Sequence, residues 1–350
     1  MRCFRNFKDV CLGNTYIFGI WLLWYACSSF STLTNKSLLS VFPYPLTATT
    51  NQLFHTSIYG FVLSKTIGHL SVTEIFNEIR FNTKSFIILG FINGTTIALF
   101  HFGLSILSAA YIHTIKTSVP LFVVMFSRLI GKRYTYKTYL ALLTIIAGII
   151  LTSKTEVTFT VPGLIVGLLS TMGSAAFSVY MKMVLNSSHL HSSNVLFVVS
   201  STSLLWILPV WIFVDLHGMI LADKGVLYSQ IRKGSYYFIL DGIFRCSQNF
   251  MAIIMLTQLS ALSYSVASVV KRLFVILTAI VFFATPASSL TYFGLSLALA
   301  GLLWYNLIKE QNLKSFSLNK GGIELNESDM LKSVRIDTLA CHSSPIRNLA

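Results

Sequence analysis

The sequence predicts an all-α multi-pass membrane protein with ten transmembrane helices. Only 11% of its residues are charged and 54% are hydrophobic, whereas soluble domains carry about 25% charged residues. Long apolar runs recur along nearly the whole chain, and about 20 such residues are enough for a helix to cross a bilayer core. Most Lys and Arg residues fall in short clusters between these runs, which is typical of charges that set membrane topology.

Ten apolar stretches define the predicted spans, and the clearest contain the runs YIFGIWLLWYA, FIILGFINGTTIALFHFGL, YLALLTIIAGIIL and GLSLALAGLLWY. The first stretch resembles a signal peptide, but further spans follow at once, so we expect it to be retained. The short segment before it leaves no room for an organelle transit peptide. The predicted spans are residues 14–40, 45–66, 85–106, 108–130, 136–153, 162–185, 194–214, 235–256, 259–283 and 290–308.

The predicted chain has three parts, a short N-terminal segment (1–13), a ten-helix domain (14–308) and a polar tail (309–350). We expect the tail to be disordered, because its composition cannot supply a packed core. Basic residues between the spans are concentrated on the side that holds the N-terminus. The positive-inside rule therefore predicts that both termini face the cytosol.

A faint internal repeat relates the two halves of the ten-helix domain. SAAYIHTIKTSVPLFVVMF from Ser108 aligns with SALSYSVASVVKRLFVILT from Ser260, and YLALLTIIAG aligns with YFGLSLALAG. Because five is an odd number, two halves of five spans, residues 14–153 and 162–308, would be inserted with opposite topology. Inverted repeats of this kind are typical of transporters, whose substrate site lies at the midplane between the halves. The alternative interpretation is chance similarity among apolar helices.

Among the basic residues inside the predicted spans, three lie far from the span ends and have no carboxylate at helical spacing, where lipid disfavours their charge. Lys116 is deep in the fourth span, and Lys271 and Arg272 are adjacent near the middle of the ninth. A charged side chain at the bilayer centre costs at least about 2.5 kcal/mol. Asp241 is the one acidic residue within a span, and it precedes Arg245 by four residues, the spacing of a helical ion pair. This pairing leaves the three cations without a carboxylate partner.

A water-filled cavity that binds an anion would offset the cost of these three charges. Lys and Arg side chains both suit phosphate oxygens, so Lys116, Lys271 and Arg272 are predicted to form a phosphate clamp. The alternative for a single long side chain is to snorkel toward the membrane interface.

Three further residues are candidates for substrate binding. His113 precedes Lys116 by three residues and shares its helical face, although a histidine on an apolar helix can equally be a hydrogen-bonded core residue. Tyr264 shares a face with Lys271 and could donate a hydrogen bond to a ligand. Lys36 ends the first span and could bind substrate or simply snorkel.

Other classes of function find no support in the sequence. The five cysteines are scattered, without a CxxC motif or a histidine at ligand spacing, so no disulfide and no metal site are predicted. No paired carboxylates or nucleophile constellation occur in the spans, so neither catalytic residues nor a cofactor are expected. The net charge is +14, but most Lys and Arg residues lie in short clusters between the apolar runs, where they set membrane topology. This charge therefore does not indicate nucleic-acid binding. A proton-coupled transporter would be expected to have a carboxylate within a span that is not paired with a basic residue. The predicted spans contain no such carboxylate, which favours anion exchange over proton coupling.

The motifs around the buried charges resemble the triose-phosphate translocator family of the drug/metabolite transporter superfamily. SYSVASVVKR is similar to the family stretch SVANxxKR, and YIHTIKTSVP to THTIKAxEP. Shorter matches are LTNKSLLSVFPYP, TSKTEVTF, FSVYMKMVL and SQNFMA. The resemblance covers roughly residues 15–308 and is greatest to subfamily E of solute carrier family 35. It implies ten helices in two inverted repeats, and strict exchange of phosphate for a phosphorylated metabolite.

The same resemblance places the family's phosphate clamp on the three cations named above. Plastid members of the family recognise the organic part of the substrate with a His, a Thr and a Tyr. At the corresponding positions this chain has Ile97, Phe100 and Gln248, whereas Asn249 beside Gln248 matches the family. An acidic residue of the family motif is replaced by Val119. The resemblance therefore implies a retained phosphate clamp and a different organic subsite, to which Gln248 and Asn249 are candidates.

These observations predict an alternating-access antiporter in an endomembrane, in the first place the Golgi, with the ER as the alternative. It would exchange a phosphorylated organic anion, such as a sugar phosphate, for phosphate or a similar counter-anion. The expected partners are this metabolite, the counter-anion and the lipid bilayer, and no nucleic acid. A nucleotide-sugar transporter of the same fold and a non-transporting membrane scaffold are the alternative functions.

Overall fold

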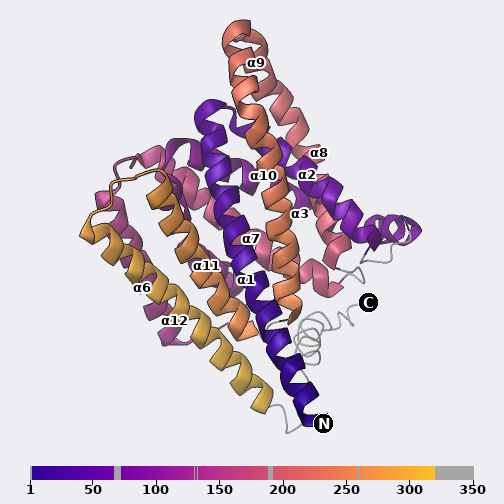
Figure 1. The fold of residues 1–350 in the computed structure, drawn as a ribbon, viewed down its shortest axis with the longest axis vertical. Coiled ribbons are helices and arrows are strands. Elements are labelled where there is room, and N and C mark those ends of the chain that lie inside the picture. The colour runs from indigo at the N-terminus through magenta and orange to yellow at the C-terminus, as the bar shows by residue number, and fades with distance from the viewer. Residues whose placement is uncertain are drawn as a thin grey trace, which may run out of the picture.

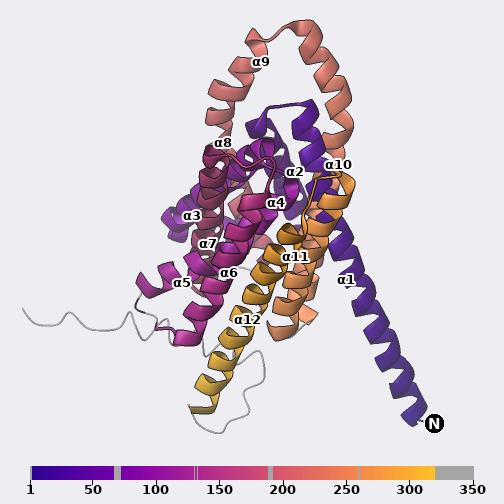
Figure 2. The ribbon, with the colours of Figure 1, turned by 90° about the vertical axis from the view of Figure 1, so that its left-hand side faces the viewer.

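The computed structural model describes residues 2–66, 72–129, 131, 133–187, 192–258 and 261–319. Within these ranges every regular element is a helix, and the helices form one elongated bundle (Figures 1 and 2). In chain order they are α1 (Arg2–Val41), α2 (Pro45–Thr66), α3 (Val72–Ile106), α4 (Ala109–Ile115), η1 (Lys116–Ser118), α5 (Val119–Leu129), α6 (Tyr136–Thr155), α7 (Val161–Ser187), α8 (Ser192–Trp211), η2 (Ile212–Leu216), α9 (His217–Leu221), α10 (Lys224–Gln258), α11 (Ala261–Phe282) and α12 (Ser289–Asn319).

Six helical segments of the described residues are long and apolar enough to cross a membrane. They are Thr83–Ile106, Ala109–Leu129, Tyr136–Thr155, Val161–Met181, Asn194–Leu221 and Ser289–Asn312. Large apolar side chains such as Leu143, Leu205 and Phe293 are exposed on the outside of the bundle, where lipid would cover them. The predicted class of all-α membrane protein is confirmed by these helices.

Several helices extend beyond the predicted spans. Helix α1 begins at Arg2, α3 at Val72 and α10 at Lys224, and α12 continues to Asn319. Apolar runs mark the part of a helix that lipid can cover, but helical hydrogen bonding continues into polar flanks. The helical end of α12 reaches into the segment 309–350 that was expected to be disordered, and residues 320–350 lie outside the described residues.

Helices α6 and α12 run side by side along their length (Figures 1 and 2). Glycines permit this close approach: a Cβ atom at Gly148 would lie 2.5 Å from the backbone nitrogen of Ala298. A Cβ atom at Gly301 would lie 2.9 Å from the backbone nitrogen of Ile145. Small residues at such positions are how membrane helices pack without a hydrophobic driving force.

The fourth predicted span is not one regular helix. A single 3-10 turn, η1, separates α4 from α5, and Pro120 follows it directly. Proline has no N–H, so residue 120 cannot donate to the carbonyl of Lys116 four residues earlier. The N–H of Val119 bonds that carbonyl instead, in the tighter 3-10 pattern. The helix is therefore interrupted at Lys116.

Candidate functional site

A cavity of about 160 Å³ lies between α1, α3, the α4–η1 junction, α10 and α11. A site needs only about 10–15 Å³ by the same measure to hold one water molecule, so this cavity has room for several waters or a small anion. Four basic side chains contribute to its lining, from three different helical segments: Lys116, Arg245, Lys271 and Arg272. No acidic residue belongs to the lining within the described part of the chain.

The two lysine ammonium groups of the cavity rest on aromatic rings. Nζ of Lys116 lies 3.4 Å from the centre of the Phe100 ring, and Nζ of Lys271 lies 4.2 Å from the centre of the Trp24 ring. Such a cation–π contact orients the ammonium group and leaves the N–H donors that point away from the ring without a partner. Among the described residues neither ammonium makes a hydrogen bond or has a carboxylate oxygen within 4.0 Å. These donors are available to a ligand.

The interruption of the fourth span provides a hydrogen-bond acceptor for Arg272. Its Nη1 donates a hydrogen bond to the carbonyl oxygen of Lys116. This carbonyl can accept a second partner because Pro120 supplies no N–H to it. The bond joins α11 to η1 and holds the three predicted clamp residues, which are far apart in the sequence, around one cavity.

Helix α1 supplies a polar wall to the cavity. Ser28, Ser31, Thr32 and Asn35 all line it, and their spacing of three and four residues places them on one helical face. Thr32 Oγ1 lies 3.2 Å from Nε2 of His113, in a hydrogen bond whose donor depends on the histidine tautomer. This wall was not among the predicted features, although the spacing of its hydroxyl and amide residues along an apolar helix is visible in the sequence.

The predicted ion pair between Asp241 and Arg245 is wrong. Asp241 is fully buried, and its Oδ1 accepts hydrogen bonds from Asn35 Nδ2 at 2.7 Å and from Ser31 Oγ at 3.4 Å. No ion pair within 4.0 Å links Asp241 to Arg245 among the described residues. Helix α10 turns the carboxylate toward α1, whereas Arg245 and Gln248, three residues apart, both face the cavity. Arg245 and Gln248 are three residues apart, so they share one face of the helix. This spacing was the sequence signal that could have identified Arg245 as a cavity residue.

The remaining candidates are placed differently. His113, Gln248 and Phe100 line the cavity. Asn249 is half-buried in α10 but does not belong to the lining. The side chain of Tyr264 lies outside the described residues.

Lys36 does not line the cavity. Its Nζ donates to the carbonyl oxygens of Leu104 and Leu107, at 2.7 and 2.8 Å. These carbonyls lie at and just beyond the C-terminal turn of α3, where a helix leaves acceptors without a partner. Lysine side chains commonly cap such ends. In this structure Lys36 therefore acts as a helix cap.

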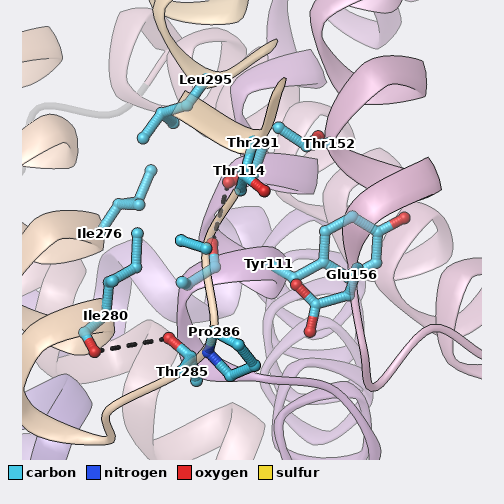
Figure 3. Close-up of a pocket in the computed structure, with 12 residues that line it drawn as sticks. Tyr111, Thr114, Thr152, Glu156, Ile276, Ile280, Thr285, Pro286, Thr291 and Leu295 are labelled. Atoms are coloured by element: carbon cyan, nitrogen blue, oxygen red, sulfur yellow. Dashed lines mark hydrogen bonds between the residues drawn. The ribbon is translucent and has the colours of Figure 1, made fainter. Parts of the chain in front are cut away.

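A second cavity, of about 20 Å³, lies between α4, α6, α11 and α12 (Figure 3). Tyr111 and Glu156 lie on one wall of it and Ile276 and Ile280 on the opposite wall (Figure 3). Its lining holds no basic residue within the described part of the chain. With one carboxylate and little room, this cavity does not suit an anion.

The fold and the larger cavity together define a multi-spanning membrane carrier whose interior is polar and strongly cationic. Comparison with known proteins agrees with this class. The model of the Triose-phosphate Transporter family matches residues 16–306, and the chain belongs to this family. Membership confirms the predictions that the chain is a transporter and not an enzyme, and that it resembles the triose-phosphate translocators.

Three relatives illustrate the similarity. The chain is 29% identical to the chloroplastic xylulose 5-phosphate/phosphate translocator of Arabidopsis thaliana, over 92% of this chain and 75% of that protein. It is 27% identical to the phosphoenolpyruvate/phosphate translocator 2 of the same organism, over 85% and 78% of the two chains. It is 26% identical to the glucose-6-phosphate/phosphate translocator 2, also from Arabidopsis thaliana, over 82% and 74%.

Proposed function

We propose that the protein is an antiporter that exchanges a phosphorylated organic anion for phosphate across a membrane. The observation that carries this proposal is the convergence of Lys116, Lys271 and Arg272 on one cavity, with two ammonium groups that have no acceptor in the described structure. A phosphate group offers charged oxygens to all three cations. The names of the relatives, which pair phosphate with a phosphorylated metabolite, support the same activity.

The cavity charge provides a physical reason for strict exchange. A bound phosphate dianion neutralises most of the positive charge, so the cavity can lose water as the protein closes around it. Without an anion the cations repel one another at low dielectric, and closing the empty cavity costs free energy. The binding site changes its access to the two sides of the membrane only when an anion occupies it. Transport is then coupled to counter-transport.

We further propose that ten spans form two inverted repeats. Each predicted span overlaps one helix or one run of consecutive helical segments, which supports the count. The contacts between α6 and α12 support the repeat, because Gly148 approaches Gly294 and Ala298 while the equivalent Gly301 approaches Ala141 and Ile145. In the alignment of YLALLTIIAG with YFGLSLALAG these two sets of residues correspond. Reciprocal contacts of this kind are those of a two-fold axis.

The orientation and the compartment are part of the same proposal. The distribution of basic residues supports cytosolic placement of both termini, with residues 14–308 as the transporter domain. We propose an endomembrane, in the first place the Golgi, as the site of action. A tag at either terminus should then be accessible to antibody after selective permeabilisation of the plasma membrane. A tag detected only after endomembranes are opened would overturn this orientation.

Reconstituted vesicles test the proposed exchange directly. Vesicles loaded with phosphate should take up labelled phosphate, and empty vesicles should not. The double substitution Lys271→Gln with Arg272→Gln should abolish uptake while the protein still folds. The matched control replaces an adjacent basic pair, Arg232 and Lys233, which is exposed at the start of α10, by glutamine and should leave uptake unchanged. Equal uptake by empty vesicles would reject coupling, and full uptake by the clamp variant would reject the site.

A further inference from the structure

Asp241 is a fully buried carboxylate without an ion-pair partner among the described residues. The expectation against proton coupling assumed that Arg245 pairs with it, whereas the structure places Arg245 on the cavity. In the described structure Oδ1 of Asp241 receives hydrogen bonds from Asn35 and Ser31, which are neutral groups, and Oδ2 receives none. Burying an ionised carboxylate in such surroundings is costly. A proton on Oδ2 would remove this cost.

The side-chain amide of Gln52 is suited to both protonation states of this carboxylate. Gln52 of α2 is buried and faces Asp241, yet neither its Nε2 nor its Oε1 makes a hydrogen bond in the described structure. A side-chain amide carries both donors and an acceptor. Nε2 can donate to Oδ2 when the carboxylate is ionised, and Oε1 can accept from Oδ2–H when it is protonated. Buried polar atoms without a partner are rare, and here they are the atoms that a proton would link.

One layer of side chains separates Asp241 from the cavity. Ser31 and Asn35, which donate to its Oδ1, also line the cavity. A cavity of about 160 Å³ has room for several water molecules. The hydroxyl of Ser31 can accept a hydrogen bond from such a water while it donates to the carboxylate. Ser31 therefore offers a proton a route between the cavity and Asp241.

The charge of the cavity couples the proton to the anion. The lining contains four basic side chains and, within the described part of the chain, no acidic one. Their positive charge stabilises the ionised form of Asp241, which burial disfavours. An anion that enters the cavity offsets part of this positive charge, so the ionised carboxylate loses stabilisation. Anion and proton therefore favour each other's binding, and this coupling is reciprocal.

Other charged or titratable groups in this region have to be separated from Asp241. Arg245 lies one turn further along α10 and acts on Asp241 through its charge, but a guanidinium does not lose its proton in proteins. His55 of α2 packs against Gly242 and bonds the main chain of its own helix. The groups that line the cavity or lie within one turn of Gln52 or Asn35 are His55, Lys36, His113, Lys116, Lys271 and Arg272.

We propose that Asp241 is a proton-binding site coupled to the cavity, so that the carrier moves a proton together with its anion. This inference goes beyond the proposed phosphate exchange and rests on it. The proton comes from water on the side to which the cavity is open and binds Oδ2 when the anion is in place. It leaves to water on the opposite side with the anion.

The substitution Asp241→Asn tests the coupling, because asparagine is neutral at every pH, like the protonated carboxylate. The dissociation constant of phosphate is measured by thermal stabilisation at slightly acidic and at slightly alkaline pH. At alkaline pH the variant should bind phosphate about fivefold or more tightly than the unmodified protein, and at acidic pH the two should agree more closely. Titration of phosphate and of the other groups is common to both proteins. The same pH dependence in both, or weaker binding by the variant, would overturn the assignment.

Asp215→Asn is the matched control. Asp215 is also a buried carboxylate, but it lies in η2, and its Oδ2 accepts hydrogen bonds from the main-chain N–H and the hydroxyl of Thr47. The control should keep the pH dependence of the unmodified protein. If replacing Na⁺ by choline weakens phosphate binding while pH has no effect, the site binds a metal cation and the assignment is wrong.

Proton movement provides a readout that a structural role of Asp241 would not change. Phosphate-loaded vesicles with a weakly buffered interior are placed in an acidic medium. For each labelled phosphate exchanged, the interior should acidify more with the unmodified protein than with Asp241→Asn. Equal acidification would show that Asp241 carries no proton.

A measurement without a variant covers the case in which Asp241→Asn fails to fold. In a weakly buffered solution the unmodified protein should take up protons when it binds phosphate. The cationic cavity alone favours the more ionised form of phosphate and would release protons, so net release would contradict the inference. Absence of phosphate binding and exchange in the unmodified protein would instead overturn the proposed function itself.

Discussion

Arg272 of α11 donates a hydrogen bond to the main-chain carbonyl of Lys116, at the point where the fourth span changes from α-helix to 3-10 turn. This bond makes an irregular backbone segment part of the cavity wall. Irregular backbone within a membrane is tolerated where it is buried in protein or lines a cavity. Here it also places the Lys116 side chain and the Arg272 guanidinium on the same cavity.

Pro120 maintains this arrangement, so its replacement by alanine is the first prediction. Pro120→Ala restores an N–H that can bond the Lys116 carbonyl in a regular α-helix. Arg272 then competes for its acceptor, and we expect the apparent affinity for phosphate to fall about tenfold. Phosphate uptake measured over a range of concentrations checks this. Pro162→Ala in the first turn of α7, where the missing N–H has no helical partner in any case, should leave the affinity unchanged.

Removing the charge of Lys116 should have opposite effects on stability and transport. The ammonium has no acceptor or carboxylate partner among the described residues, and apolar replacement of buried charges can stabilise a protein by about 1–4 kcal/mol. Lys116→Met should therefore raise the thermal stability of the empty protein and abolish phosphate exchange. Phosphate at a hundredfold its dissociation constant should stabilise the parent by about 2.7 kcal/mol and should not stabilise the variant. Lower stability of the empty variant would indicate that Lys116 has a structural role.

The sequence predicted the helices and the three clamp positions from two strong physical signals. Apolar runs located the spans, and the high cost of charge in lipid singled out Lys116, Lys271 and Arg272. Both signals are local in sequence. The convergence of the three residues on one cavity depends on how the helices pack, and here it agrees with the expectation.

The roles of Arg245 and Lys36 could not be predicted from these local signals in the sequence. The spacing of Asp241 and Arg245 predicted an ion pair, but α1 offers Ser31 and Asn35 to the carboxylate and leaves the arginine to the cavity. The partner helix decides this outcome, and spacing within one helix does not reveal it. Lys36 likewise was a candidate for substrate binding because of its charge, whereas its acceptors are carbonyls of a helix end distant in sequence.

The capping role of Lys36 gives a third prediction. Lys36→Met leaves the carbonyls of Leu104 and Leu107 without their donor, and an unsatisfied buried acceptor costs about 1–3 kcal/mol. We expect thermal unfolding at lower temperature and an unchanged dissociation constant for phosphate. Lys36→Arg keeps a donor in place and should recover most of the stability. Loss of phosphate binding in a folded Lys36→Met protein would instead assign Lys36 to the substrate site.

The last prediction concerns the close packing of α6 on α12. In Gly148→Ala the new methyl group would lie 2.5 Å from the backbone nitrogen of Ala298 and 2.6 Å from the carbonyl oxygen of Gly294. Backbone atoms cannot move aside without shifting a helix, so we expect destabilisation of about 1–3 kcal/mol. Gly19→Ala is the matched control, because nothing lies within 4 Å of a Cβ atom there and alanine favours the helix. Thermal unfolding of both variants in the same detergent provides the comparison. Gly301 occupies the reciprocal position, so Gly301→Ala should destabilise the protein to a similar extent. A neutral result at either glycine would contradict the two-fold relation proposed for the two helices.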